Sequence, residues 1–260
     1  MSFHSAGIRR HVCQTPVAMI LRKEKDPMGK AIADYWKNGK AGRLRVFSPM
    51  FDEDEIPVPH LFRTVEEMSS IEQEALRMAQ GKTLDVGAGA GCHALALQGR
   101  GIDVTAIDIS PLSVEVMQAR GVQNARLADF FSLDTQFDTI LMLMNGIGIV
   151  GTLLNMPRFF QLLDSILAPG GQVVCDSSDI QYVFEDEDGT IEFPDADGYY
   201  GELSYRMQYK NIVGNPFPWL YVDAETLSAQ AEQHGYSVEV IIKGQHDDYL
   251  ARIKKSDAMG

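Results

Sequence analysis

From about residue 70 onward, short apolar runs of the kind found in buried strands alternate with segments whose apolar positions recur every three to four residues. The apolar runs predict strands over residues 83–86, 103–109, 125–128, 137–144 and 172–176. Between them the sequence predicts helices. The first carries a capping box at Ser70-Ile-Glu-Gln73, and a later one starts at Ser110-Pro111 and ends at Gly121. This alternation is typical of a parallel sheet with helices on both faces, so we predict an α/β fold.

The alternation is interrupted after the fifth strand. Residues 177–202 contain nine acids and no Lys or Arg, and residues 199–209 then alternate as a half-buried strand does. A last helix and two strands joined as a hairpin are predicted over residues 224–234, 237–243 and 248–254. We therefore expect an acidic and aromatic insertion over residues 177–222, followed by the elements that complete the sheet.

The segment before residue 70 differs from the rest of the chain. It predicts a helix over residues 26–37 and an extended stretch over residues 43–48, but it holds too few apolar residues for a core of its own. A chain of 260 residues has room for one full α/β domain and an appendage. We assign residues 1–69 to an N-terminal extension and cap, and residues 70–260 to the main domain.

A glycine-rich turn follows the first strand, in the sequence Leu84-Asp-Val-Gly-Ala-Gly-Ala-Gly-Cys92. Glycines allow the backbone to turn and to approach a ligand closely, and a helix N-terminus follows them. A dinucleotide site requires a small third residue where this chain has Cys92. Asp85, two residues before the first glycine, suits a ligand that carries an ammonium or sulfonium group better than a pyrophosphate.

Polar residues also end the next three strands. Asp108 is placed to accept both hydroxyls of a ribose, as such acids do in NAD enzymes and in methyltransferases alike. Asp129 and Phe130 suit an adenine, through its amino group and through stacking on the ring. Asn145 contacts either the cofactor or the acceptor, or is only an amide at a strand end.

These motifs resemble those of the class I S-adenosylmethionine-dependent methyltransferases. Asp85 to Gly91 matches the family's D-x-G-x-G-x-G motif, Ala128-Asp-Phe130 its adenine-contacting stretch, and Leu167-Ala-Pro-Gly-Gly171 its L-x-P-G-G turn. The resemblance covers residues 70–176 by motif and residues 220–254 by topology. It implies a seven-stranded, mostly parallel, doubly wound sheet with an antiparallel last strand. It also implies that S-adenosylmethionine is the cofactor, with S-adenosylhomocysteine as product, bound by Asp85, Gly87, Ala88, Gly89, Gly91, Asp108, Ile109, Asp129, Phe130 and Asn145.

The expected activity is methyl transfer to an acceptor by in-line displacement. The donor is already activated, so orientation and a dry site suffice, and the sequence assigns no catalytic residue. Methylases that act on the amino groups of nucleic-acid bases carry Asp/Asn-Pro-Pro-aromatic at the position of Asn145. This chain lacks the two prolines and the aromatic residue after Asn145, which favours a small-molecule acceptor. Two alternatives stay open: an NAD(P)-dependent oxidoreductase and a non-catalytic nucleoside-binding protein.

Charge and composition limit the partners. The chain has 36 acids and 23 basic residues, a net charge of −13, which disfavours a nucleic-acid partner. Residues 1–45 hold ten Lys/Arg and three Asp/Glu (+7), and the remainder holds 13 and 33 (−20), so an anionic partner at the N-terminal segment stays open. The cysteines and histidines show no metal-site spacing, and no apolar run predicts a membrane span. We expect a cytoplasmic enzyme, and the sequence assigns no oligomeric state.

Several residues have two interpretations each. His93 is a base in the pocket or a packed residue at a helix start, and His246 is a solvated turn residue. Arg63 is a candidate partner for the carboxylate of the cofactor. The acid-rich segment either attracts a cationic acceptor or is a solvated loop. Six aromatic residues either line an acceptor pocket beneath a lid formed by the insertion or only fill the core. They are Phe217, Trp219, Tyr221, Tyr199, Tyr200 and Tyr205.

Overall fold

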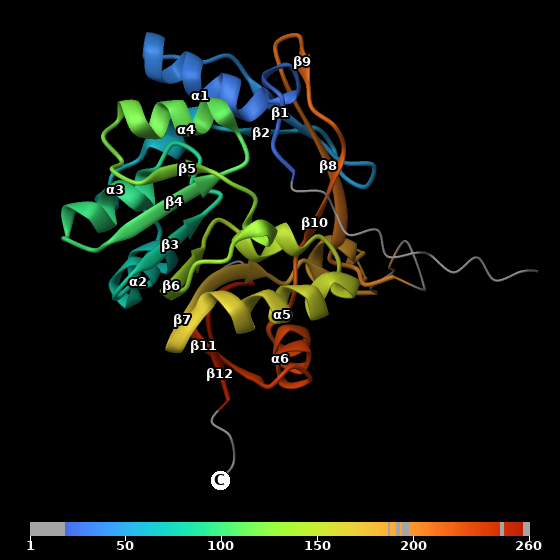
Figure 1. Ribbon diagram of the computed structural model, residues 1–260. Coiled ribbons are helices and arrows are strands. Elements are labelled where there is room, and N and C mark those ends of the chain that lie inside the picture. The colour runs from blue at the N-terminus through green and yellow to red at the C-terminus, as the bar shows by residue number, and fades with distance from the viewer. Residues whose placement is uncertain (1–18, 187, 191–192, 194–197, 245–246, 257–260) are drawn as a thin grey trace, which may run out of the picture.

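The computed structural model describes residues 19–186, 188–190, 193, 198–244 and 247–256. A seven-stranded sheet with the order β11-β12-β7-β6-β3-β4-β5 forms its centre (Figure 1). The strands are β3 (Thr83–Val86), β4 (Val104–Asp108), β5 (Ala125–Leu127), β6 (Phe137–Met142), β7 (Leu167–Ser178), β11 (Tyr236–Lys243) and β12 (Asp248–Lys255). Only β12 runs antiparallel to its neighbours in this sheet. The predicted mostly parallel sheet with an antiparallel last strand is confirmed.

Helices cover both faces of this sheet. One face carries α2 (Ser70–Met78), α3 (Cys92–Gly99) and α4 (Pro111–Ala119), and the other carries α5 (Met156–Ile166) and α6 (Ala224–Glu232). Successive strand residues point to opposite faces. Within β6, Leu141 packs in the cluster with α2 to α4, and its neighbours Ile140 and Met142 pack in the cluster with α5.

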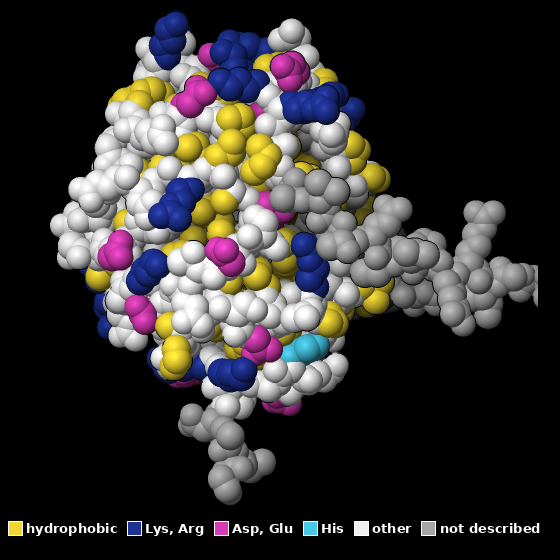
Figure 2. All heavy atoms as spheres, in the orientation of Figure 1, with side chains coloured by type: hydrophobic (Ala, Val, Ile, Leu, Met, Phe, Trp, Pro, Cys, Tyr) yellow, Lys and Arg dark blue, Asp and Glu magenta, His cyan; other side chains and the backbone are white. Residues whose placement is uncertain are grey.

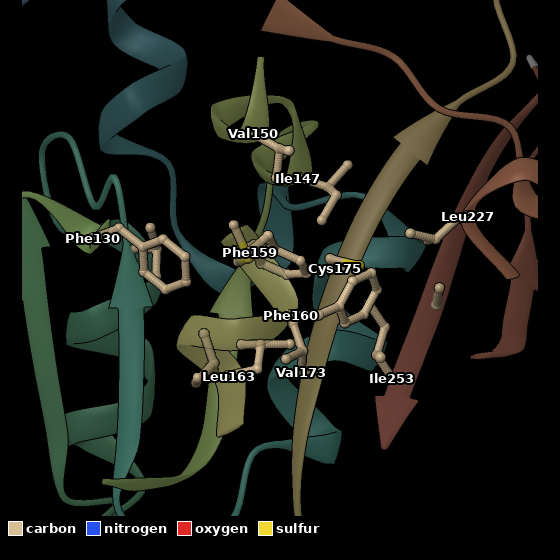
Figure 3. Packing of buried hydrophobic residues seen from close by; sticks show 14 of the residues in the cluster. Phe130, Ile147, Val150, Phe159, Phe160, Leu163, Val173, Cys175, Leu227 and Ile253 are labelled. Carbon is tan, nitrogen blue, oxygen red and sulfur yellow. The ribbon is translucent and has the colours of Figure 1, made fainter. Parts of the chain in front are cut away.

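The core on the α5 side is rich in aromatic rings. Figure 3 shows Phe159 and Phe160 of α5 among Val173 and Cys175 of β7, and all four are fully buried. The Phe159 and Phe160 ring centroids lie 5.2 Å apart in an edge-to-face arrangement. This layer packs beneath the sheet whose strands β3, β4, β5 and β6 lead into the predicted site residues.

A second, antiparallel sheet joins two parts of the chain that the sequence analysis treats separately. Its order is β10-β8-β1-β2, with β9 paired to β8. The strands are β1 (Leu44–Phe47), β2 (Asp54–Ile56), β8 (Glu202–Tyr209), β9 (Ile212–Val213) and β10 (Phe217–Leu220). β1 therefore places the N-terminal cap directly beside β8 of the insertion, with Leu44 opposite Tyr209. The cap and the insertion share this sheet.

The N-terminal helix α1 (Pro27–Asn38) is anchored on α4. Asp26 caps α1 by accepting a hydrogen bond from the Gly29 backbone N–H at 2.8 Å, and its other oxygen accepts one from the Ser110 hydroxyl, which caps α4. A Cβ at Gly29 would overlap the side chains of Ser110 and Asp26, so glycine is required at this contact. The two helix N-termini are thus locked together beside the carboxyl end of β4.

Some predicted boundaries are wrong. The capping box of α2 is Ser69 with Glu72, one residue earlier than predicted, because Ser69 has the extended backbone of an N-cap. β6 ends at Met142, since Met144 and Asn145 adopt left-handed backbone conformations, with φ of 63° and 55°. β7 begins at Leu167 and includes the glycine turn expected before it. The described part of the chain has no helix that is long and apolar enough to span a bilayer.

Candidate functional site

The glycine turn after β3 has two different functions along its length. Gly87, Gly89 and Gly91 all have positive φ, at 67°, 57° and 81°. A Cβ at Gly87 would meet no atom within 4 Å, so the backbone there borders open space. A Cβ at Gly91 would come within 3.0 Å of the Met117 and Val122 side chains. Gly87 and Gly89 are therefore available to a ligand, and Gly91 serves the packing of the turn against α4.

Asp108 at the end of β4 holds this turn in place. Its Oδ2 accepts a hydrogen bond from the Gly89 backbone N–H at 2.9 Å, and its Oδ1 accepts one from the Ser110 N–H at 2.8 Å. Burial raises the pKa of Asp108 to about 6, and the nearby carboxylates of Asp26 and Asp85 act in the same direction. Each oxygen keeps a further lone pair with which to accept a ligand hydroxyl.

The predicted adenine-contacting stretch lies under a segment that the sequence analysis did not place at the site. The Met19 backbone N–H donates to Asp129 Oδ2 at 2.9 Å, and the Leu21 N–H donates to the Ile109 carbonyl at 2.9 Å. No sequence signal marks Met19 to Leu21, because the contacts are made by the backbone. This strap, residues 19–21, runs past the ends of β4 and β5.

The Phe130 ring is not available for stacking. It is 1% exposed and packs against Phe159 in the core, with ring centroids 6.1 Å apart. Figure 3 shows it beside α5 and facing the interior. The prediction that its ring stacks on an adenine is therefore wrong in this structure, because burying an aromatic ring in the core is strongly favourable. Only its backbone remains near the site.

Three buried side-chain atoms in the described part of the chain have no hydrogen-bond partner, and all belong to predicted site residues: Arg63 Nε, Asp85 Oδ2 and Asn145 Oδ1. Asp85 is 1% exposed, and burial raises its pKa. Asp85 lies near the end of β3, and Asn145 lies in the turn that follows the adjacent strand β6. An unpartnered buried polar atom is costly, and bound ligand groups of opposite character remove that cost. The donor Arg63 Nε matches a ligand carboxylate, and the acceptors Asp85 Oδ2 and Asn145 Oδ1 match a ligand ammonium group.

Arg63 belongs to a buried cluster that sequence reasoning did not detect. It forms an ion pair with Glu72 of α2, and His93 at the start of α3 lies with Nε2 2.8 Å from Glu72 Oε1. Burial alone raises the pKa of Glu72, but hydrogen bonds from His93 and Arg63 outweigh it and hold that pKa well below its usual range. This places His93 in the packed cluster instead of in the open pocket.

The turn after β6 is fixed by Asp176, which the sequence analysis named only as the end of a strand. The Asn145 backbone N–H donates to Asp176 Oδ1 at 3.0 Å, and Asn145 Nδ2 donates to the Leu220 carbonyl at 3.3 Å. Burial raises the pKa of Asp176 to about 6. The only sequence signal for this role of Asp176 was that a carboxylate ends the predicted strand that became β7, which pairs directly with β6.

The aromatic residues of the insertion divide into two groups. Trp219 of β10 packs on Gly148, where a Cβ would overlap the indole, and the Tyr199 hydroxyl donates to Asp223 at 2.6 Å. These two residues attach the insertion to the main domain. Tyr205 and Tyr221 instead line a cavity, with their hydroxyls 3.4 Å apart. His246 lies outside the described residues.

Gly148→Ala is expected to lower the free energy of unfolding by about 1–3 kcal/mol, because the new methyl group displaces Trp219. Chemical denaturation measures this change. Gly99→Ala is the matched control: a Cβ there meets nothing within 4 Å at the end of α3, so stability stays the same or rises. Equal stability of the two variants would contradict the Trp219 contact.

Comparisons with known proteins agree with this geometry. The sequence model of a family described as a methyltransferase domain matches residues 58–240. No curated protein matches. A solved structure from Bacteroides fragilis, described as a SAM-dependent methyltransferase in complex with S-adenosyl-L-homocysteine, is 56% identical, covers 92% of this chain and 98% of its own, and has a TM-score of 0.87.

More distant structures share the fold. A complex of DhpI with SAM and HEP is 21% identical over 71% of this chain and 84% of its own, with a TM-score of 0.53. The CcbJ methyltransferase from Streptomyces caelestis is 14% identical over 91% of this chain and all of its own, with a TM-score of 0.56.

Proposed function

Because the chain belongs to the class I S-adenosylmethionine-dependent methyltransferases, its reaction is methyl transfer from that cofactor, and we propose that the acceptor is a small molecule. The observation that carries the site assignment is the set of three unpartnered buried atoms at Arg63, Asp85 and Asn145. They lie around a glycine turn whose backbone at Gly87 borders open space. This arrangement suits the amino-acid end of the cofactor.

We assign the remaining contacts from the same geometry. The carboxylate of Asp108 accepts hydrogen bonds from the ribose hydroxyls, and that of Asp129 accepts one from the adenine amino group. The backbones of Ile109 and Phe130 flank the adenine ring. Arg63 Nε donates to the carboxylate, and Asp85 Oδ2 and Asn145 Oδ1 accept from the ammonium group. When bound, the cofactor supplies a methyl group that is already activated by a sulfonium.

The protein's own contribution is orientation and the exclusion of water. The Asp108 bonds to Gly89 and Ser110 hold the turn, and the Asp176 bond to Asn145 holds the opposite side of the site. We propose that the cap and the insertion act together as a lid over the acceptor, because they share one sheet.

The two described cysteines, Cys92 and Cys175, are unpaired and buried, which supports the cytoplasmic location predicted from the sequence.

Half of the described basic residues of the N-terminal segment form local ion pairs, which supports a small-molecule acceptor over RNA. Lys23 pairs with Glu115, Lys30 with Asp34, and both Arg43 and Arg45 with Glu53. Figure 2 shows basic and acidic side chains interspersed at the end of the molecule that carries α1 and β9. A polyanion-binding surface would present unpaired basic residues on one face.

The test is to follow labelled methyl groups from S-adenosylmethionine in a cell extract that has been separated by size. We expect label in the small-molecule fraction, and none above background with Asp108→Ala. Calorimetry with S-adenosylhomocysteine should show one site per chain. Label found only in the protein or RNA fraction would contradict the proposed acceptor class, and absent binding of S-adenosylhomocysteine would contradict the site.

The affinity for S-adenosylhomocysteine is expected to fall about tenfold between pH 7 and pH 5. The carboxyl group of Asp108, with a pKa of about 6, is ionised above this value and accepts from both ribose hydroxyls, and its protonation below pH 6 removes that capacity. Calorimetry at several pH values measures the slope. In Asp108→Asn the affinity is lower throughout and the pH dependence is lost, whereas a constant wild-type affinity would contradict the assignment.

A further inference from the structure

We infer that the acceptor is an uncharged, single-ring aromatic molecule with one amino or hydroxyl group, bound in the cavity between β8, β10 and the 3₁₀ helix η7 (Gln181–Phe184). This inference rests on the proposed function, since it assigns the acceptor subsite of the same enzyme. The cavity measures about 190 Å³. The cavity is open to solvent on the side of Tyr182 and Val183, which are 55% and 42% exposed. Its volume is sufficient for one ring with a small substituent, since an enclosed cavity of about 150 Å³ in another protein holds benzene.

The lining of the cavity disfavours a negatively charged acceptor. It consists of aromatic and aliphatic side chains from both parts of the second sheet region, among them Phe51, Leu203 and Tyr205, and none of its lining residues is charged. An anionic acceptor would lose hydration there without gaining a partner. Asp179, which accepts a hydrogen bond from Tyr200 at 2.8 Å, adds negative charge nearby and disfavours anions further.

Two tyrosine hydroxyls supply the polar contact. The Tyr205 hydroxyl donates to the Tyr221 hydroxyl at 3.4 Å, which leaves the Tyr221 proton free for an acceptor heteroatom. Burial raises the pKa of Tyr205 far above neutrality, so this group stays protonated. The pair therefore binds and orients the acceptor and does not remove its proton.

The cavity borders the cofactor site through the Asn145 turn. Leu220, whose carbonyl accepts from Asn145 Nδ2, immediately precedes Tyr221 of the cavity wall. On the other side, Asp176 holds the Asn145 N–H, and β7 continues from there toward Ile180 of the same wall. The elements that hold Asn145 thus also build the cavity, next to the proposed position of the methionine end of the cofactor.

The reaction at this place is balanced without a protein base. The lone pair of the acceptor nitrogen or oxygen forms the bond to the methyl carbon, and the carbon–sulfur bond breaks with its electron pair remaining on sulfur. The acceptor heteroatom then releases its proton to water. An uncharged heteroatom is required because a protonated amine has no lone pair to donate.

The test measures binding of phenol, aniline and benzoate to the protein saturated with S-adenosylhomocysteine, by ligand-observed NMR at pH 7.5. We expect phenol and aniline to bind and benzoate not to bind. Val183→Trp places a large ring at the cavity, where Val183 is 42% exposed, and should weaken phenol binding at least about tenfold. Leu154→Trp, at a position that is 90% exposed and does not line the cavity, is the matched control and should leave binding unchanged.

Tyr221→Phe, which removes the hydroxyl proposed to donate to the acceptor, separates the hydrogen bond from the shape of the cavity. It should weaken phenol binding about fivefold, the effect of one neutral hydrogen bond, with the affinity for S-adenosylhomocysteine unchanged. If S-adenosylhomocysteine binds but neither phenol nor aniline does, if benzoate binds as well as they do, or if Val183→Trp has no effect, the inference is overturned and the proposed function stands. Failure of S-adenosylhomocysteine to bind the wild-type protein overturns both.

Discussion

Asp108→Ala is expected to lower the affinity for S-adenosylhomocysteine by about 100-fold or more. The carboxylate is proposed to accept both ribose hydroxyls, and hydrogen bonds to a charged group contribute about 1.5–3 kcal/mol each. The substitution also frees the Gly89 and Ser110 N–H groups that Asp108 holds, so the glycine turn loses its fixed shape. Calorimetry of the purified variant measures the loss.

The control for this prediction is Asp103→Ala. Asp103 lies just before β4, is exposed, and is at the opposite end of the strand from the site. Its substitution changes the net charge by the same amount but should leave the affinity unchanged. An Asp108→Ala variant that is folded by circular dichroism and binds within threefold of wild type would rule out Asp108 as the ribose ligand.

Glu72→Ala is expected to lower the free energy of unfolding by about 3–5 kcal/mol, because it leaves the buried guanidinium of Arg63 without its carboxylate. The same change removes the acceptor for the Ser69 N–H in the capping box of α2 and the partner of His93. Urea denaturation measures the loss. Glu74→Ala on the same helix breaks only the solvent-facing pair with Arg77 and should cost less than about 1 kcal/mol.

This cluster also predicts how stability depends on acid. Because the folded state holds the pKa of Glu72 below its unfolded value of 4.5, the contribution of Glu72 is fully present above pH 4.5 and is lost as the pH falls toward the folded pKa. The stability difference between wild type and Glu72→Gln should therefore narrow on acidification below pH 4.5. A difference that stays constant from pH 6 to pH 3 would show that the carboxylate is not ionised in the folded protein.

The main sheet was predictable from local sequence because each of its signals lies within a few residues. Residues 83–86 alternate polar Thr83 and Asp85 with apolar Leu84 and Val86. A turn with positive φ can follow only where residues such as Gly87 permit it. Asp108 and Asp129 follow strands whose carboxyl ends meet at one edge of a parallel sheet. The order of these signals along the chain carries the family resemblance from which the fold and the cofactor were predicted.

The side-chain environment of individual residues was less predictable. The aromatic ring of Phe130 could stack on a base, but it is buried in the core on the α5 side. Arg63 was predicted as a partner for the carboxylate of the cofactor, whereas its pairing with Glu72 and His93 depends on how α2 and α3 pack together. Burial decides between such alternatives, and it is set by neighbours that lie far away in the sequence.

Periodicity and spacing, which are properties of neighbouring residues, by themselves predicted an α/β fold and a glycine turn followed by carboxylates at strand ends. The doubly wound sheet with an antiparallel last strand was predicted from the resemblance to the methyltransferase family that these motifs carry. Only the tertiary structure decided that the cap and the insertion share one sheet, with β1 paired to β8. It also decided that Tyr205 and Tyr221 face one cavity beside Asn145. These contacts join segments more than 150 residues apart in one case and 75 in the other, and their formation depends on the packing of the whole chain.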